Sequence, residues 1–248
     1  MREFKVTGLA ISIQLVVACG HQTVSAAPSS KPPFSAPPAA CSSTTKLGET
    51  CESRPDQIRP TQFAIGMRDV ESKREKIAKI KNNPERLAKY LSENILPAVK
   101  GPDGIFYLTD GHHRTRALLD EGVKRVYVRI SKDKARLRQA EFWIQMRDER
   151  LVWLFDENGT GPLRPEDLPA NLKGQRDDLY RSLSEETLDD ECYSKTDTPF
   201  QQFMWANYYR PKISAEQLRR DWPESVKLAC KLSHLPAAKD LPGYIPER

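Results

Sequence analysis

Two adjacent histidines and two arginines lie in one short run that is the part of the chain best suited to chemistry. Residues 108–118 read Leu-Thr-Asp-Gly-His-His-Arg-Thr-Arg-Ala-Leu, and they include two of the four histidines. An apolar stretch precedes Asp110 and Gly111, and apolar residues at helical spacing follow as far as Gly122. This order predicts a strand, a tight turn and a helix. We expect Asp110 to cap that helix and Gly122 to end it.

A helix that starts at this turn would point its first backbone N–H groups outward. Unpaired donors at the positive end of a helix dipole form an anion-binding site. We expect Gly111 to let a phosphate approach the backbone, and Arg114 and Arg116 to pair with its charge. The motif therefore predicts a phosphate-binding turn.

Three residues of the same run, Asp110, His112 and His113, are candidate catalytic groups. Imidazole titrates near neutral pH, so His112 is a candidate general base, and His113 is a candidate general acid or phosphate hydrogen-bond donor. Asp110 could orient a histidine or hold a divalent metal such as Mg²⁺ or Mn²⁺ that activates water. Neighbours on a helix point about 100° apart, so we do not expect both histidines to serve one site in the same way. A nearby carboxylate, such as Glu71 or Glu75, would favour catalysis over binding alone.

Positive charge is concentrated next to the motif. Residues 114–138 include nine Lys or Arg and three Asp or Glu, while the whole chain has a formal charge of +5. Such a basic stripe suits a polyanionic partner, and it is equally compatible with a solvated surface. The sequence thus favours a nucleic acid or a phosphorylated ligand, held by salt-sensitive contacts.

The first residues have the composition of a targeting segment. Arg2 and Lys5 precede an apolar stretch too short to span a bilayer as a helix, which predicts a signal peptide over residues 1–18. Val-Val-Ala-Cys-Gly is similar to a bacterial lipoprotein box, with Cys19 as the lipidated residue, whereas Val-Ser-Ala offers a cleavage site near residue 26. We expect an exported protein, either a periplasmic or membrane-anchored lipoprotein or a secreted one, that touches a membrane only through an N-terminal lipid.

Four further cysteines remain once Cys19 is set aside. Their even number in an exported chain predicts disulfides, and of three possible pairings we expect the local one, Cys41 with Cys51 and Cys192 with Cys230. No Cys-x-x-Cys or Cys/His ligand spacing occurs, so a zinc site has little support.

Composition divides the rest of the chain into three parts. Residues 19–57 begin with a stretch rich in Pro, Ser and Ala, which predicts a disordered tether. Residues 58–150 mix short strands and helices without a repeated strand-helix unit, which predicts a compact α+β domain. Residues 151–248 predict a mostly helical C-terminal extension packed on that core.

Periodicity places the main elements of both parts. In the domain we expect helices over residues 69–81, from Pro84 onward and over 131–150, the last with Leu137, Ala140 and Ile144 inward. Two apolar runs, 95–99 and 105–108, flank turn residues and predict a hairpin, and 124–130 predicts a half-buried strand. In the extension we expect a strand at 151–155, helices at 177–188, 200–209 and 215–232, and an aromatic cluster that forms core rather than a base-stacking platform.

The run Asp-Gly-His-His-Arg-Thr-Arg-Ala-Leu from Asp110 resembles the phosphate-binding turn of the ParB and sulfiredoxin superfamily, which has the form Gly-x-x-Arg at a helix start after a strand. With Arg-Pro-Thr-Gln from Arg59 and two segments near residues 165–169 and 180–183, it more closely resembles the ParB-like nucleases, over residues 58–205. The resemblance implies a ParB/sulfiredoxin-like α+β fold and cleavage of phosphodiesters.

Departures from the superfamily patterns narrow the expected activity. The turn is similar to that of sulfiredoxins, but His112 occupies the position of their reactive cysteine, which argues against sulfiredoxin chemistry. The helix-turn-helix and dimerisation domain of chromosome-partitioning ParB proteins are not evident. The turn is also similar to that of free-serine kinases. We therefore expect an exported ParB-like nuclease or phosphodiesterase, with two alternatives: a non-catalytic envelope module that binds a nucleotide or another phosphorylated ligand, or a phosphotransferase.

Overall fold

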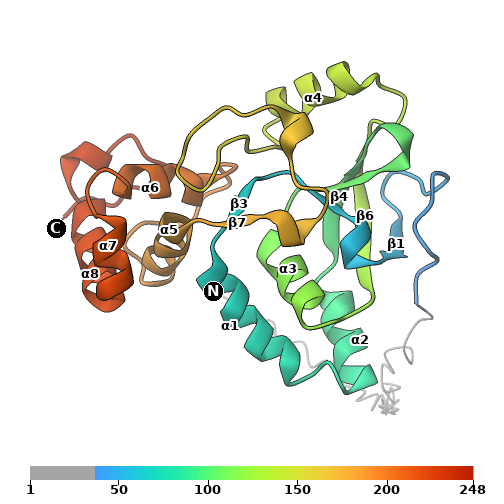
Figure 1. The fold of residues 1–248 in the computed structure, drawn as a ribbon, viewed down its shortest axis with the longest axis horizontal. Coiled ribbons are helices and arrows are strands. Elements are labelled where there is room, and N and C mark those ends of the chain that lie inside the picture. Colours follow the sequence, from blue (N-terminus) through green and yellow to red (C-terminus); the bar gives the residue numbers. More distant parts are fainter. Residues whose placement is uncertain (1–36, 248) are drawn as a thin grey trace, which may run out of the picture. The chain divides into compact units, whose positions relative to one another are not determined.

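Five short strands form the main sheet, in the order β1-β6-β4-β5-β2 (Figure 1). The computed structural model describes residues 37–247. The expected signal peptide, the lipidation residue Cys19 and the cleavage site near residue 26 lie outside the described residues.

The centre of the sheet is the hairpin that the sequence predicted. Strands β4 (Leu96–Lys100) and β5 (Phe106–Leu108) pair antiparallel, with Val99 opposite Tyr107. Strand β6 (Val126–Asp133) runs parallel to β4, and α3 (His112–Asp120) lies between β5 and β6 in the chain. The edges are β1 (Thr50–Ser53), antiparallel to β6, and β2 (Arg59–Pro60), parallel to β5. Pro60 fits an edge strand because it has no N–H to donate.

The prediction of a tether up to residue 57 is wrong in its second half. Strand β1 belongs to the sheet, and the Cys41–Cys51 disulfide closes the segment before it. Buried Lys100 donates to the Thr45 carbonyl at 2.8 Å and pairs with Asp133 at 2.7 Å, which fixes this segment further. A four-residue strand with mostly polar side chains has too little periodicity to be recognised without its partner strand.

Three helices pack with the sheet around its hydrophobic core. They are α1 (Met67–Ala78), α2 (Pro84–Glu93) and α3. Helix α2 starts as predicted, with Pro84 in its first turn and Asn83 Oδ1 accepting the N–H of Arg86 at 3.0 Å. The fully buried residues shared by these elements are Ile58, Ile65, Val70, Ile77, Leu91, Leu96, Leu108, Leu118, Val128 and Ile130.

The helix predicted over residues 131–150 is shorter, and it buries a different face. Strand β6 continues to Asp133, and α4 covers only Gln139–Asp148. Phe142, Trp143 and Met146 are buried, whereas Ala140 is exposed and Ile144 is 48% exposed. Leu137 lies before the helix and packs partly against the same cluster. Aromatic packing against Tyr107, with ring centroids 4.8 Å from Phe142 and 5.2 Å from Trp143, decides which face is buried.

A second, two-stranded sheet connects the domain to the C-terminal part of the chain. Strand β3 (Ala64–Ile65) pairs parallel with β7 (Arg176–Asp177). The strand expected at residues 151–155 is reduced to one bridge between Trp153 and Gln62, although Val152 and Leu154 are buried. Apolar character here reflects burial of a loop and not strand pairing.

Four helices make up the C-terminal part: α5 (Leu179–Asp189), α6 (Gln201–Tyr209), α7 (Ala215–Arg220) and α8 (Trp222–Ser233) (Figure 1). The single helix expected at 215–232 breaks into α7 and α8 because Asp221 and Pro223 begin a new helix, with Asp221 Oδ1 accepting the Glu224 N–H at 3.2 Å. Trp205 and Tyr209 are fully buried, so these aromatic residues form core as predicted.

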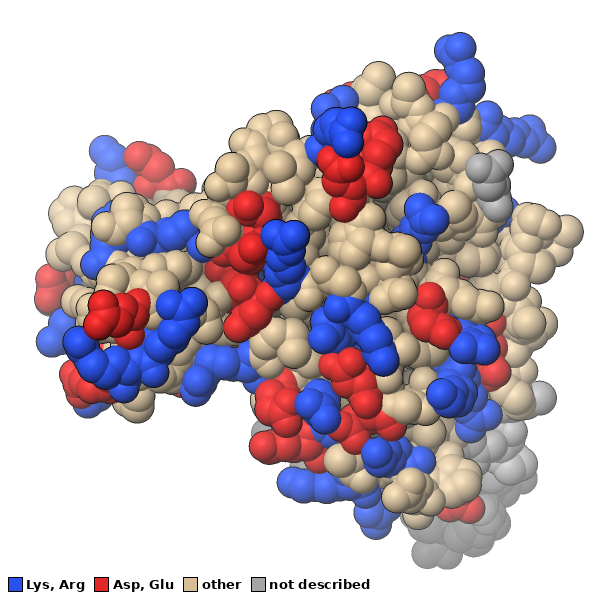
Figure 2. Space-filling view, viewed as in Figure 1, with Lys and Arg blue, Asp and Glu red and all other residues tan. Residues whose placement is uncertain are grey.

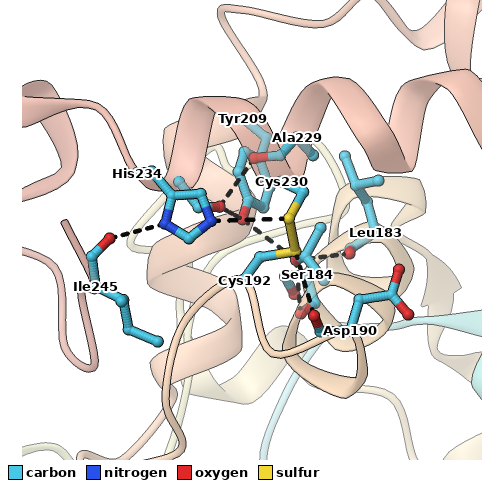
Figure 3. Close-up of a disulfide and its surroundings, with 11 residues drawn as sticks. Leu183, Ser184, Asp190, Cys192, Tyr209, Ala229, Cys230, His234 and Ile245 are labelled. Atoms are coloured by element: carbon cyan, nitrogen blue, oxygen red, sulfur yellow. Dashed lines mark hydrogen bonds between the residues drawn. A yellow bond between two sulfur atoms is a disulfide. The ribbon is translucent and has the colours of Figure 1, made fainter. Parts of the chain in front are cut away.

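Both disulfides have the predicted pairing. Cys192, just after α5, is bonded to Cys230 of α8, and His234 lies beside them with its Nδ1 2.8 Å from the Ile245 carbonyl (Figure 3). Two disulfides are compatible with an extracellular location. Within residues 37–247, no helix has both the length and the hydropathy needed to span a bilayer.

Candidate functional site

The turn between β5 and α3 has a backbone shape that requires glycine. Gly111 has φ 80° and ψ 22°, and a Cβ atom built there would lie 2.9 Å from Leu96 Cδ2. The residue at the cap position of α3 is Gly111 itself, so the prediction that Asp110 caps the helix is wrong. Asp110 Oδ1 instead accepts the Gly111 N–H at 2.7 Å, and no side chain caps the first turn of α3 in the described part of the chain. The first N–H groups of the helix therefore lack a side-chain acceptor.

The start of α3 opens onto a cavity of about 390 Å³. Helix α1, helix α5, residues 195–198 and the first turn of α6 form its other walls. The residues that line it are Asp69 and Lys73 of α1; Asp110, Gly111, His113 and Arg114 at the start of α3; Arg181 and Glu185 of α5; and Lys195, Thr196, Asp197, Thr198, Gln201 and Gln202.

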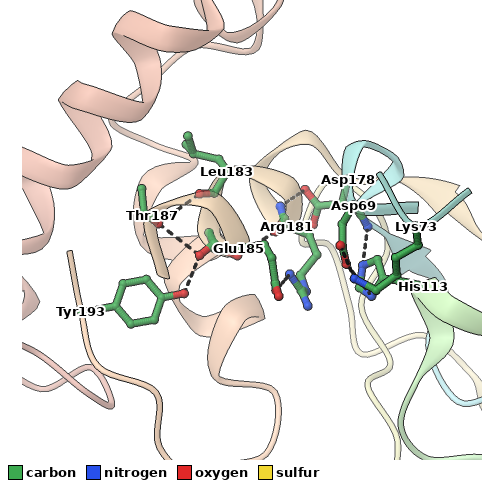
Figure 4. Close-up of polar contacts among 11 residues, drawn as sticks. Asp69, Lys73, His113, Asp178, Arg181, Leu183, Glu185, Thr187 and Tyr193 are labelled. Carbon is green, nitrogen blue, oxygen red and sulfur yellow. Dashed lines mark hydrogen bonds and ion pairs between the residues drawn. The ribbon is translucent and has the colours of Figure 1, made fainter. Parts of the chain in front are cut away.

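His113 joins the start of α3 to the start of α1. Its Nε2 accepts the Gly66 N–H at 3.2 Å, and its Nδ1 lies 3.5 Å from Asp69 Oδ2 (Figure 4). Burial holds the pKa of His113 well below its usual value, and the positive charges of Arg181 and Lys73 lower it further. His113 is therefore a neutral imidazole with its Nε2 lone pair already in use, which is unsuited to a general acid.

His112 points into the protein interior. Its Nε2 accepts the Thr61 N–H at 3.2 Å, and the Thr61 hydroxyl donates to the Leu108 carbonyl at 2.6 Å. Burial lowers the pKa of His112 to about 4. These contacts attach the motif helix to the segment after β2, and they give no support to the predicted role of His112 as a general base.

The two arginines of the motif serve different parts of the structure. Arg114 is half-buried at the cavity, where its guanidinium lies beside the Tyr90 hydroxyl. Arg116 pairs with Asp120 at 2.8 Å and donates to the Leu172 carbonyl at 3.0 Å. These contacts hold the 3₁₀ turn Leu172–Gly174 against α3 and give no support to the predicted role of Arg116 in phosphate binding.

Sequence reasoning missed two ion pairs that line the cavity. Asp69 pairs with Lys73 on α1, and Arg181 pairs with Glu185 at 2.7 Å on α5 (Figure 4). Asp178 caps α5 through Oδ1, which accepts the Tyr180 N–H at 2.9 Å and so fixes the helix start next to Arg181. Arg181 lies in one of the segments that carried the resemblance, but nothing local to that segment placed it near the motif.

Arg181 also has an unused donor. The residue is 7% exposed, and its Nε has no hydrogen-bond acceptor among the described residues. A buried donor without an acceptor costs on the order of 1–3 kcal/mol. Of the two carboxylates that the sequence offered as partners for catalysis, Glu71 pairs with Arg74 at 2.9 Å, and neither Glu71 nor Glu75 lines the cavity.

The described residues do not assemble a metal site. They contain no group of three or more His, Cys, Asp or Glu side chains placed to hold an ion. Asp110, the residue predicted as a possible metal ligand, has one carboxylate oxygen on the Gly111 N–H.

The basic stripe of residues 114–138 is partly neutralised. Lys132 and Lys134 both pair with Glu149, at 2.8 and 2.5 Å, and Arg116 pairs with Asp120. The face shown in Figure 2 has Lys and Arg interspersed with Asp and Glu. That face therefore has no continuous basic surface.

The fold class is α+β: a mixed sheet whose hairpin leads through a left-handed glycine into a helix at a polar cavity. The family described as "Putative ParB-like nuclease" matches residues 51–211, and the chain belongs to this family. The match begins inside β1, which agrees with the place of that strand in the sheet.

Two solved structures illustrate what the chain is similar to, and the first of them has a similar fold. The crystal structure of protein Atu1540 from Agrobacterium tumefaciens is 32% identical, with a TM-score of 0.75, and the alignment covers 81% of this chain and 98% of that one. C-terminally truncated chromosome-partitioning protein ParB from Caulobacter crescentus, complexed with CTP-gamma-S, is 13% identical, covers 75% of this chain and 99% of that chain, and has a TM-score of 0.27. A search among curated proteins finds no match.

Proposed function

We propose that this chain binds a phosphate group at the start of α3. One observation supports the proposal above all: the left-handed turn at Gly111 presents an uncapped helix start to a cavity that Arg114 also lines. Backbone N–H groups and a guanidinium directed at the same space are suited to phosphate oxygens. Binding has more support than catalysis, because the Nε2 atoms of His112 and His113 both accept backbone N–H groups.

Titration calorimetry with inorganic phosphate on the full chain tests this proposal. Arg114→Ala should weaken binding by about tenfold or more, the loss expected for a charge-assisted hydrogen bond of roughly 1.5–3 kcal/mol. Arg164→Ala is the matched control, because Arg164 is exposed, pairs with Asp167 at 2.9 Å and does not line the cavity. Absence of phosphate binding, or equal binding by Arg114→Ala and the unmodified chain, contradicts the proposal.

Phosphodiester cleavage is the second candidate function, and family membership favours it. Asp110 is the remaining candidate for a general base, since its carboxylate is exposed at the cavity. A nuclease requires the protein to cut single- or double-stranded DNA or RNA with Mg²⁺ or Mn²⁺ supplied, and Asp110→Asn to abolish cutting while Arg164→Ala retains it. If all these substrates stay intact, cleavage is contradicted and phosphate binding remains as the proposed function. Phosphoryl transfer is tested with ATP or ADP and small hydroxyl compounds.

We further propose that the chain is exported, on the basis of its first residues and its two disulfides. Cell fractionation of the full chain should place it in the envelope or the medium. Fatty-acid labelling that is lost in Cys19→Ser would identify the lipoprotein form. If neither the unmodified chain nor Cys19→Ser is labelled, cleavage near residue 26 is favoured. Recovery in the cytoplasm with reduced cysteines contradicts export.

A further inference from the structure

We propose that the ligand of this cavity is a small phosphomonoester that also carries a protonated amine, and not a nucleic-acid strand. The inference rests on the phosphate-binding function proposed above and specifies the ligand class for the same site. Three observations carry it: the balance of charge in the cavity, the size of the cavity, and the Arg181 guanidinium in its lining.

Charges in the cavity balance. Asp69 neutralises Lys73, and Glu185 neutralises Arg181. The other charged groups of the lining are the cations Arg114 and Lys195 and the carboxylates Asp110 and Asp197, and none of the four forms an ion pair within residues 37–247. Two cations and two anions without an ionic partner suit a ligand that itself carries both signs of charge.

A nucleic-acid strand fits this arrangement poorly. A protein that follows a phosphate backbone without reading its bases uses a groove of continuous positive charge with aromatic platforms for stacking. Here Asp110 and Asp197 are exposed carboxylates at the cavity and would repel successive phosphates. The lining includes no Phe, Tyr or Trp side chain. The cavity thus lacks both features that bind a strand.

The size of the cavity and the Arg181 guanidinium favour a single phosphate. A volume of about 390 Å³ is in the range of small-molecule sites. Arg181 lines the cavity, is nine-tenths buried, and has an Nε without an acceptor among the described residues. A phosphate held between the start of α3 and this guanidinium would place a second anion beside the Arg181 cation, which pairs with Glu185.

A matched pair of compounds tests the inference on the full chain. Phosphoethanolamine and propyl phosphate have similar size, and only the first carries an amine. We expect calorimetry to show phosphoethanolamine binding about tenfold more tightly, the effect of one charge-assisted contact. Asp197→Asn and Asp110→Asn, made separately, should show which carboxylate holds the amine, because the preference shrinks in that variant. Asp167→Asn is the control, because Asp167 is exposed and pairs with Arg164 outside the cavity.

The possible outcomes separate this inference from the function on which it rests. If inorganic phosphate binds and the two organic phosphates bind equally, the ligand class is wrong while phosphate binding stands. If a short oligothymidylate binds and phosphoethanolamine does not, the inference is overturned in favour of a nucleic-acid ligand. If no phosphate compound binds to a chain that melts cooperatively, both proposals fail. A preference for phosphoethanolamine that persists in both aspartate variants also overturns the assignment of the amine to these carboxylates.

Discussion

The imidazole of His112 accepts the backbone N–H of Thr61 at 3.2 Å, and this contact joins the first turn of α3 to the residue that follows β2. The ring is 4% exposed, so its charged form would lose almost all contact with water. The cost of charging a buried imidazole makes this contact dependent on pH.

Stability should fall as the pH drops below the ordinary range of histidine. The pKa of His112 is about 4 in the folded protein and 6.5 when unperturbed, so the unfolded chain binds the proton first. The contribution of neutral His112 is present above pH 6.5 and is lost progressively towards pH 4, to a total of about 3 kcal/mol. His113, whose pKa is also lowered, acts in the same direction. Urea unfolding across this pH range should give a shallower decline for His112→Gln. An identical decline in that variant would contradict the assignment.

Gly111→Ala should destabilise the protein more than Gly122→Ala. Both glycines have positive φ, 80° and 75°, so each alanine carries a backbone cost of about 1–2 kcal/mol. Only at residue 111 does the new Cβ meet another atom, Leu96 Cδ2 at 2.9 Å, whereas nothing lies within 4 Å at residue 122. We expect an additional loss of about 1 kcal/mol or more at residue 111, together with weaker phosphate binding. Equal losses in thermal or urea unfolding would show that Leu96 moves freely.

Arg116→Ala should mainly lower stability, whereas Arg114→Ala should mainly lower phosphate affinity. Arg116 donates to the Leu172 carbonyl and pairs with Asp120, so its removal should lower the free energy of unfolding by about 2 kcal/mol. Phosphate affinity should stay within about twofold of the unmodified chain, since a factor of two is only about 0.4 kcal/mol. Arg114→Ala should lose affinity with a smaller change in stability. Calorimetry and unfolding on both variants distinguish these roles, and an affinity loss in Arg116→Ala equal to that of Arg114→Ala would return Arg116 to the site.

Removing the Cys192–Cys230 disulfide should cost more than removing Cys41–Cys51. The two bonds close sequence separations of 38 and 10 residues. In the chain-entropy model, these separations correspond to roughly 4 and 3 kcal/mol. Hydrogen exchange should also rise in the segment between α5 and α6 when Cys192 and Cys230 are both replaced by serine, because the disulfide anchors that segment to α8. Part of the same segment lines the cavity. Unchanged exchange in that segment would show that the contacts of Gln201 with the Ser194 and Pro242 carbonyls, at 2.7 and 2.9 Å, are sufficient to hold it.

The motif was predictable because its information is local. A strand, a glycine turn and a helix follow one another within 15 residues of the chain, from Phe106 to Asp120, and the family assignment from the same residues is confirmed. The pairing of cysteines was also predictable, since the short separations are favoured by loop closure. Pro84 and the turn residues after Lys100 located a helix start and a hairpin for the same reason.

Residues that act through distant contacts were not predictable. Asp69, Arg181 and Lys195 come together only when α1, α5 and the following segment pack at the start of α3. Arg116 lies on the motif helix at a spacing suited to a phosphate, and only the carbonyl of Leu172 reveals its structural role. The boundary of α4 was misjudged because β6 continues through polar residues to Asp133, where ladder pairing outweighs side-chain pattern.

The first amide of α1, the Met67 N–H, is bonded to Asp177 Oδ1 at 2.9 Å across a sequence separation of 110 residues. Closing a loop of that length is an entropic barrier that local segments do not face, so we expect this junction to form after the hairpin and its helix have folded. Because Asp69 lies two residues beyond Met67 and Arg181 four beyond Asp177, the walls of the cavity meet only when this loop closes. A chain still emerging from the ribosome would have its motif turn in place and yet be unable to retain a ligand until its last third had arrived.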